Sequence, residues 1–179
     1  MKRIIFLTTI ISVLLCICFG SIYYYTNNNI IFSLAITFLT ISYHFIMRLL
    51  VGLIINSIMK NKADYNKRWF KTNKLEEKWY QFLKIKKWKK IMPTYEKELF
   101  DPKLHSWEDI LMAMCQAEVV HEIIMILSYI PLIFSIWFNE FIVFLITSVL
   151  ASLLDYIYVM MQRYNRNRIL RIINKNHSI

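Results

Sequence analysis

Residues 141–162 read FIVFLITSVLASLLDYIYVMMQ, a continuous apolar run whose one charged residue is Asp155. A helix needs about 20 such residues to cross the hydrocarbon core of a bilayer. Only Asn139 and Glu140 separate this run from another at residues 109–138. So short a link predicts that the two runs form an antiparallel hairpin of membrane-spanning helices.

Two further apolar runs come earlier, at residues 4–25 and 30–59. The first resembles a secretory signal, but no Ala-x-Ala cleavage site follows it, so we expect a retained helix. The composition is 57% hydrophobic with two glycines, which argues against an ordinary soluble domain. The sequence thus predicts one all-α membrane domain, residues 1–179, built as a four-helix bundle.

The 22 Lys and Arg residues, which give a net charge of +10, are distributed unevenly along the chain. All but Arg48 lie before the first run, within residues 60–103 or after residue 162. Basic residues accumulate on the cytoplasmic side of membrane spans, so both termini and residues 60–107 are predicted to be cytoplasmic. The bias toward Ile, Lys and Asn is typical of low-GC bacteria, so we expect a multi-pass protein of the bacterial cell membrane.

The segment at residues 60–107 mixes lysines with aromatic residues, among them Trp79 and Trp88. Apolar positions in residues 77–91, a stretch that includes Lys89, are mostly three or four apart and predict one amphipathic helix. A helix with lysines on one face and aromatics on the other is suited to the lipid headgroup layer. Nucleic acid also binds segments of this composition. Because this segment is tethered between two spans, we expect it to contact anionic lipid headgroups and not nucleic acid.

Ionisable side chains within the predicted spans are candidates for chemistry, because each costs about 2.5–3.5 kcal/mol near the bilayer centre. At about 1.5 Å per residue along a helix, these side chains lie about 12 to 22 Å from the cytoplasmic edge of the membrane, as counted for all but Glu122. This shared depth predicts one polar layer. The residues are His44, Arg48, Glu118, His121, Glu122 and Asp155.

The spacing of these residues favours catalysis. Glu118, His121 and Glu122 share one helix face, and a carboxylate beside a histidine raises its basicity as a general base. His44 and Arg48 share another face, from which an arginine can stabilise an oxyanion.

A structural interpretation stands beside the catalytic one. The embedded charges would hold the helices together, with Asp155 pairing with Arg48 or Arg163. Neither the histidines nor Cys16, Cys18 and Cys115 have metal-ligand spacing, so no metal is expected.

Three stretches together resemble the bacterial glycosyl-4,4'-diaponeurosporenoate acyltransferase family. They are residues 78–89, the sequence AEVVH at 117–121 leading to Pro131, and QRYNRNR at 162–168. Position 167 is asparagine here, where carotenoid-pathway members have proline. The resemblance implies transfer of a fatty acyl chain to a sugar hydroxyl of a membrane glycolipid such as a glycosylated carotenoid. The matching polar positions are Glu118, His121, Arg163, Asn165, Arg166 and Arg168.

We therefore expect a membrane acyltransferase without a tightly bound cofactor. His121 would remove the hydroxyl proton, oriented by Glu118 or Glu122, and Arg48 with His44 would stabilise the oxyanion. The donor would be acyl-CoA or acyl carrier protein, and the residues expected to bind substrates are Arg163, Asn165, Arg166, Arg168, Trp79, Trp88 and Lys89. Two alternatives remain, a non-enzymatic lipid-binding or assembly protein and an intramembrane hydrolase or transporter, and the sequence indicates no oligomeric state.

Overall fold

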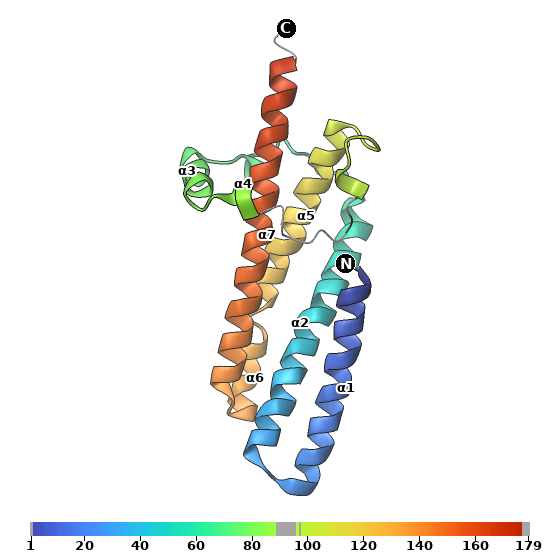
Figure 1. Ribbon diagram of the computed structural model, residues 1–179, viewed down its shortest axis with the longest axis vertical. Coiled ribbons are helices and arrows are strands. Elements are labelled where there is room, and N and C mark those ends of the chain that lie inside the picture. The colour runs from blue at the N-terminus through green and yellow to red at the C-terminus, as the bar shows by residue number, and fades with distance from the viewer. Residues whose placement is uncertain (1, 89–95, 97, 177–179) are drawn as a thin grey trace. The chain divides into compact units, whose positions relative to one another are not determined.

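The computed structural model describes residues 2–88, 96 and 98–176, and this part of the chain is helical with no strand (Figure 1). The predicted all-α fold class is confirmed. The elements are α1 (Lys2–Thr26), α2 (Asn29–Met59), η1 (Arg68–Phe70), α3 (Lys74–Phe82), α4 (Ile85–Trp88), η2 (Glu98–Phe100), α5 (Trp107–Leu127), α6 (Pro131–Phe138) and α7 (Phe141–Asn176).

Four helical stretches are long and apolar enough to cross a membrane, as the sequence predicted. They are Arg3–Thr26, Asn29–Met59, Trp107–Phe138 and Phe141–Asn174. The chain is thus a membrane protein by the length and composition of its helices.

The third stretch is interrupted, whereas the sequence suggested one run through residues 109–138. Helix α5 ends at Leu127, and α6 begins at Pro131. Proline has no N–H for the carbonyl four residues earlier, which is that of Leu127. That carbonyl instead accepts hydrogen bonds from the Ile130 N–H at 3.1 Å and from the Tyr43 hydroxyl at 2.9 Å.

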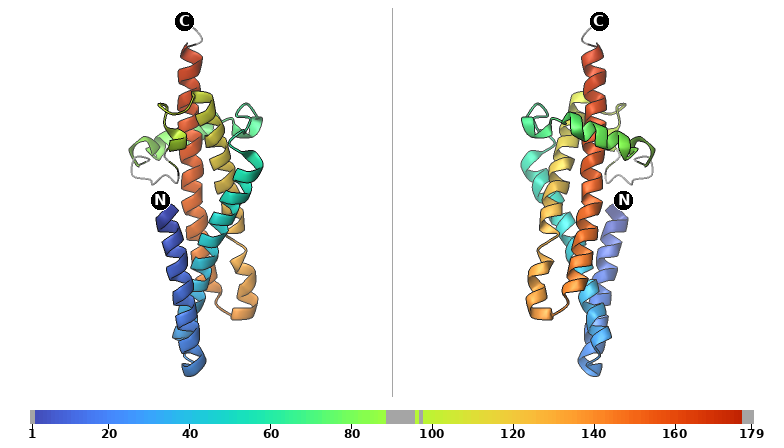
Figure 2. Two further views of the ribbon diagram at one scale, coloured as in Figure 1. Left: turned by 90° about the vertical axis from the view of Figure 1, so that its right-hand side faces the viewer. Right: turned by 90° about the vertical axis from the view of Figure 1, so that its left-hand side faces the viewer.

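Helix α7 extends past Gln162, where the sequence placed the end of the fourth span, and reaches Asn176. Figure 2 shows it as one unbroken helix in both views. Residues 163–176 contain neither proline nor glycine, and their Arg, Leu and Lys residues have high helix propensity. The arginines after Gln162 therefore lie on a helix with fixed spacing, not on a loose terminal segment.

The prediction of one amphipathic helix over residues 77–91 is wrong. Helices α3 and α4 are separated at Leu83 and Lys84, and residues 89–95 lie outside the described part. Lys84 has a left-handed backbone with φ of 53°, a conformation that cannot continue a right-handed helix. A run of apolar spacing does not reveal such a break, because lysine has high helix propensity.

The chain divides into two compact units. Unit 1 comprises Met1–Gly52 and Ile123–Asp155, and unit 2 comprises Leu53–Glu122 and Tyr156–Ile179. In unit 1, Phe19 stacks on Phe38 at 5.5 Å, and the Ser42 hydroxyl donates to Ser12 at 3.0 Å, so both apolar and polar contacts join α1 to α2.

The described residues of unit 2 form hydrophobic clusters in its interior. Each cluster brings α5 or α7 against segments from residues 53–106. Their buried members are Ile110, Leu111, Met114 and Ile169; Ala63, Phe70 and Cys115; and Tyr80, Ile85 and Met160. This packing positions the polar side chains that join α5 to α7.

Candidate functional site

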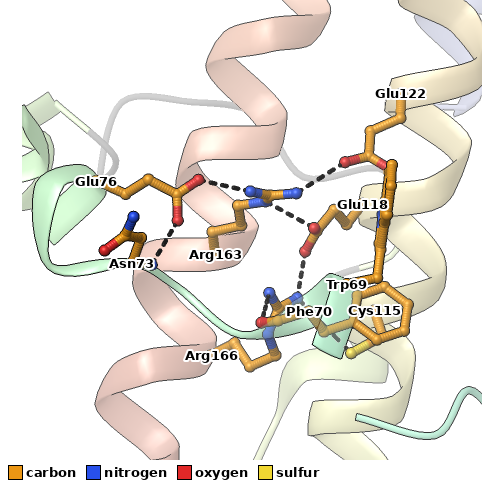
Figure 3. A network of polar contacts seen from close by, with 9 residues as sticks. All are labelled: Trp69, Phe70, Asn73, Glu76, Cys115, Glu118, Glu122, Arg163 and Arg166. Carbon is orange, nitrogen blue, oxygen red and sulfur yellow. Dashed lines mark hydrogen bonds and ion pairs between the residues drawn. The ribbon is translucent and has the colours of Figure 1, made fainter. Parts of the chain in front are cut away.

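A buried ion pair joins α5 to α7 inside unit 2. The carboxylate of Glu118 has 0% side-chain exposure, and Arg166, with which it pairs, has 1%. The second oxygen of Glu118 accepts a hydrogen bond from the Arg163 Nε at 2.7 Å. One carboxylate therefore binds two guanidinium groups from the facing helix (Figure 3).

Arg163 lies at the centre of this network, with three carboxylates around it (Figure 3). Besides Glu118, its Nη2 donates to Glu122 at 3.0 Å, and its Nη1 donates to Glu76 of α3 at 2.6 Å. Glu122 also accepts a hydrogen bond from the Trp69 indole at 2.9 Å. Each of the three nitrogens of the Arg163 guanidinium thus donates a charge-assisted hydrogen bond.

Helical spacing explains how the two sets of charges meet. Glu118 and Glu122 are four residues apart on α5, and Arg163 and Arg166 are three apart on α7. Each pair therefore lies on one face of its helix. The sequence predicted the shared face of the two glutamates, and the continuation of α7 supplies the matching face of arginines.

Arg166 holds the short η1 segment to the helix pair. Its Nη2 donates to the Phe70 carbonyl, and its guanidinium lies 5.2 Å from the centre of the Phe70 ring. Its Nη1 also contacts the Cys115 sulfur at 3.7 Å. Because Arg166 is buried and binds Glu118 and Phe70, it holds η1 and α5 to α7.

An open cavity of about 460 Å³ adjoins the network and is lined by Arg68, Trp69 and Arg163. Arg68 is exposed, and Trp69 is 66% exposed, although its indole nitrogen is bound to Glu122. The cavity is thus lined by two arginines and one tryptophan, residue types suited to an anionic ligand with an apolar portion.

His121 lies one turn beyond Glu118 on α5 and is half-buried. Its ring stacks on the Tyr158 ring, with centroids 4.7 Å apart and planes 8° from parallel. The hydrogen bonds described above join Glu118 and Glu122 to arginines and an indole. A role for His121 as a base, oriented by either carboxylate, stays a prediction.

Residues 66–175 match the family of glycosyl-4,4'-diaponeurosporenoate acyltransferases, and this stretch contains the whole ion-pair network. The chain belongs to this family. It is therefore an acyltransferase, which confirms the family and the enzyme class predicted from its motifs. No curated protein and no solved structure matches the chain significantly.

The embedded residues of α2 belong to unit 1 and lie before the matched stretch. Arg48 pairs with Asp155, as one of the alternatives from the sequence predicted, and donates to the carbonyls of Ala151 at 3.3 Å and His44 at 3.1 Å. The His44 ring is buried, and within residues 2–88, 96 and 98–176 neither of its nitrogens has a hydrogen-bond partner. Glu118, His121 and Glu122 are in unit 2.

The remaining predicted substrate-binding residues have diverse surroundings. Asn165 is half-buried, Arg168 is exposed, and Trp79 is 60% exposed with its ring 5.8 Å from that of Phe82. The side chain of Trp88 and the whole of Lys89 lie outside what the structure describes. Across the described ranges, no group of three His, Cys, Asp or Glu side chains is placed to hold a metal ion.

Sequence reasoning missed Glu76, Arg68 and Trp69. Glu76 had one local signal, because it follows Asn73 by three residues, a spacing typical of helix N-termini. Its carboxylate does accept the Asn73 N–H at 2.9 Å. Its second contact, with Arg163, joins residues 87 apart in the chain and has no local signal.

Proposed function

We propose that this acyltransferase moves a fatty acyl chain from a cytoplasmic thioester donor to a sugar hydroxyl of a glycosylated lipid, with a glycosylated carotenoid as the first candidate. The observation that carries the proposal is the match over residues 66–175, which contains both His121 and the arginine–glutamate network. The four apolar helices support a lipid acceptor, because such a substrate reaches the enzyme from the bilayer.

His121 is the general base of the proposed reaction. It takes the proton of the acceptor hydroxyl while the hydroxyl oxygen attacks the thioester carbonyl carbon. The new C–O bond forms, the C–S bond breaks, and the proton on His121 passes to the departing thiolate. Stacking on Tyr158 supports this role, because it restrains the imidazole ring on a helix that Glu118 ties to α7.

The buried ion pairs have a positioning function in this proposal. Arg163 and Arg166 hold α5 against α7 through Glu118, and the backbone one turn away carries His121. Arg48 and His44 are assigned no step, since the Arg48–Asp155 pair supports a packing function within unit 1.

Donor and location complete the proposal. The protein lies in a bacterial cell membrane, with both termini and residues 60–107 on the cytoplasmic side, because almost all Lys and Arg flank the spans there. Acyl-CoA or acyl carrier protein is the donor, no tightly bound cofactor takes part, and anionic headgroups contact the lysine-rich segment.

The test uses the full-length protein in lipid nanodiscs with labelled acyl-CoA, or acyl carrier protein, and a glycosylated carotenoid acid. Wild type should form an acylated glycolipid. His121→Ala should insert into the nanodisc and unfold at the same denaturant concentration as wild type, but it should form almost no acylated glycolipid. His105→Ala is the matched control and should keep full activity. Full product from His121→Ala would disprove the assigned base, and release of free fatty acid without glycolipid product would indicate a hydrolase.

A further inference from the structure

The cavity beside Arg163 has the features of a binding site for a phosphate ester. Two arginines, Arg68 and Arg163, and one aromatic residue, Trp69, line it. We propose that this cavity binds a phosphate group of the acyl donor, and that the Glu76 carboxylate occupies the site on Arg163 until the phosphate replaces it. The identity of the ligand rests on the proposed function, while the site itself rests on the contacts of Arg163 with its three carboxylates.

The three partners of Arg163 differ in how deeply they are held. Glu118 has 0% side-chain exposure and a second arginine partner. Glu122 is 21% exposed and also binds the Trp69 indole. Glu76 is the most exposed at 32%, and it approaches from a short helix outside the α5–α7 pair. An incoming anion therefore exchanges most readily with Glu76. This carboxylate is already the most hydrated of the three, so it gives up the least interaction energy when it moves into water.

Glu76 can leave Arg163 without unfolding α3. Its two oxygens have separate functions, since Oε1 accepts from Arg163 and Oε2 accepts the Asn73 N–H that caps the helix. Helix α3 is also held by Tyr80, which is 6% exposed, and by Glu77, which pairs with Arg171 at 2.8 Å. Displacement of the Glu76 carboxylate therefore frees Nη1 of Arg163 while Tyr80 and Glu77 hold α3 in place.

Charge balance explains why the exchange is one anion for another. Three carboxylates bind Arg163, and one of them, Glu118, also pairs with Arg166, so Arg163 has more negative partners than one guanidinium group can neutralise. A phosphate added to all three would be repelled, whereas a phosphate that replaces Glu76 keeps its attraction to Arg163 and gains exposed Arg68. Bidentate recognition by arginine is the usual chemistry for such a group.

The experiment measures binding without turnover, using the full-length protein in phosphatidylcholine nanodiscs. The probes are coenzyme A, 4'-phosphopantetheine and pantetheine, which lacks the phosphate. Coenzyme A stands for a coenzyme-linked donor, and 4'-phosphopantetheine stands for the arm of a carrier protein. Both phosphorylated probes should bind more tightly than pantetheine, and a preference between them identifies the donor source.

Glu76→Gln is the decisive variant, because glutamine at this position still caps α3 but carries no charge. It should tighten 4'-phosphopantetheine binding about two- to fivefold, the range expected from removing one competing ion pair. Glu77→Gln, the control on the same helix, should leave binding unchanged. Arg68→Gln, at an exposed position, should weaken binding by a factor of about five.

The proposal is overturned if Glu76→Gln binds the phosphorylated probes no more tightly than wild type, if Glu77→Gln has the same effect, or if pantetheine binds equally well. Acyl transfer is measured separately on the same preparations. If acyl transfer occurs but Glu76→Gln binds the phosphorylated probes no more tightly than wild type, the phosphate site is disproved and the proposed function stands. The expected binding pattern without transfer to any hydroxyl acceptor disproves the proposed function alone.

Discussion

Arg166 and Glu118 form an ion pair in which neither side chain is more than 1% exposed. Removing one partner of such a pair leaves a buried charge uncompensated, at a cost of about 3–5 kcal/mol. Glu118→Gln should therefore lower the free energy of unfolding by about that amount, measured by denaturant unfolding in detergent. Arg171→Gln, which breaks a pair at a 68% exposed arginine, should cost less than about 1 kcal/mol. Equal losses in the two variants would contradict the assigned burial.

The Arg48–Asp155 pair allows a structural function to be separated from a catalytic one. Asp155 is 1% exposed and Arg48 15%, so Arg48→Met should reduce the folded yield by removing the positive charge that compensates a buried carboxylate. The double variant Arg48→Met with Asp155→Leu should recover both yield and acyl transfer, because neutral partners of similar size need no compensation. Recovery of yield without recovery of transfer would instead show that Arg48 takes part in the reaction.

The stacking of His121 on Tyr158 predicts a positioning effect on catalysis. Tyr158→Leu should lower kcat about threefold to tenfold, since an aromatic pair contributes about 0.5–1.5 kcal/mol beyond its buried area. Tyr158→Phe keeps the ring and should retain more of the activity. Steady-state kinetics on the reconstituted enzyme should show the change in kcat and little change in KM. A loss confined to KM would place the ring in substrate binding.

We expect the bond from Tyr43 to the Leu127 carbonyl to contribute more because Pro131 has no N–H for that carbonyl. Tyr43→Phe should cost about 1 kcal/mol of stability, because the carbonyl at the end of α5 loses a donor. In a Pro131→Ala background residue 131 regains its N–H, so the same change should cost less. A double-mutant cycle on unfolding free energies measures this difference. Strict additivity of the two changes would refute the dependence.

Helix α3 predicts a response to anionic lipid. Leu75, Trp79 and Phe82 are 63%, 60% and 74% exposed, and they are spaced four and three residues apart on one face. Replacing Trp79 and Phe82 by serine should reduce the gain in activity when phosphatidylglycerol is added to phosphatidylcholine nanodiscs. The measurement is the ratio of the rate with phosphatidylglycerol to the rate without it. If the double variant lost the same fraction of activity in both lipids, this ratio would not change, and contact of α3 with headgroups would be contradicted.

The sequence predicts the spans and one face of the site for a clear physical reason. Apolar length defines the four helices, and the spacing of Glu118 and Glu122 defines a polar face on α5. These are local properties, and both appear in the structure as expected from helical geometry.

The features that sequence could not predict depend on contacts between distant segments. Lys84 takes a left-handed conformation that no local preference of lysine favours. Glu76 meets Arg163 across 87 positions, which required both the end of α3 and the continuation of α7 to be known. Arg68 and Trp69 enter the site because Arg166 holds the Phe70 carbonyl beside α5.

The two neighbouring glutamates of α3 bind different parts of α7. Glu76 binds Arg163, and Glu77 binds Arg171 and the Asn167 amide at 2.8 Å each. Arginines eight residues apart lie about 12 Å apart along the helix axis, so a slide of α3 by one turn would break both pairs together. The two pairs therefore fix one register of α3 on α7, and the buried Tyr80 together with Glu77 keeps that register when Glu76 leaves Arg163.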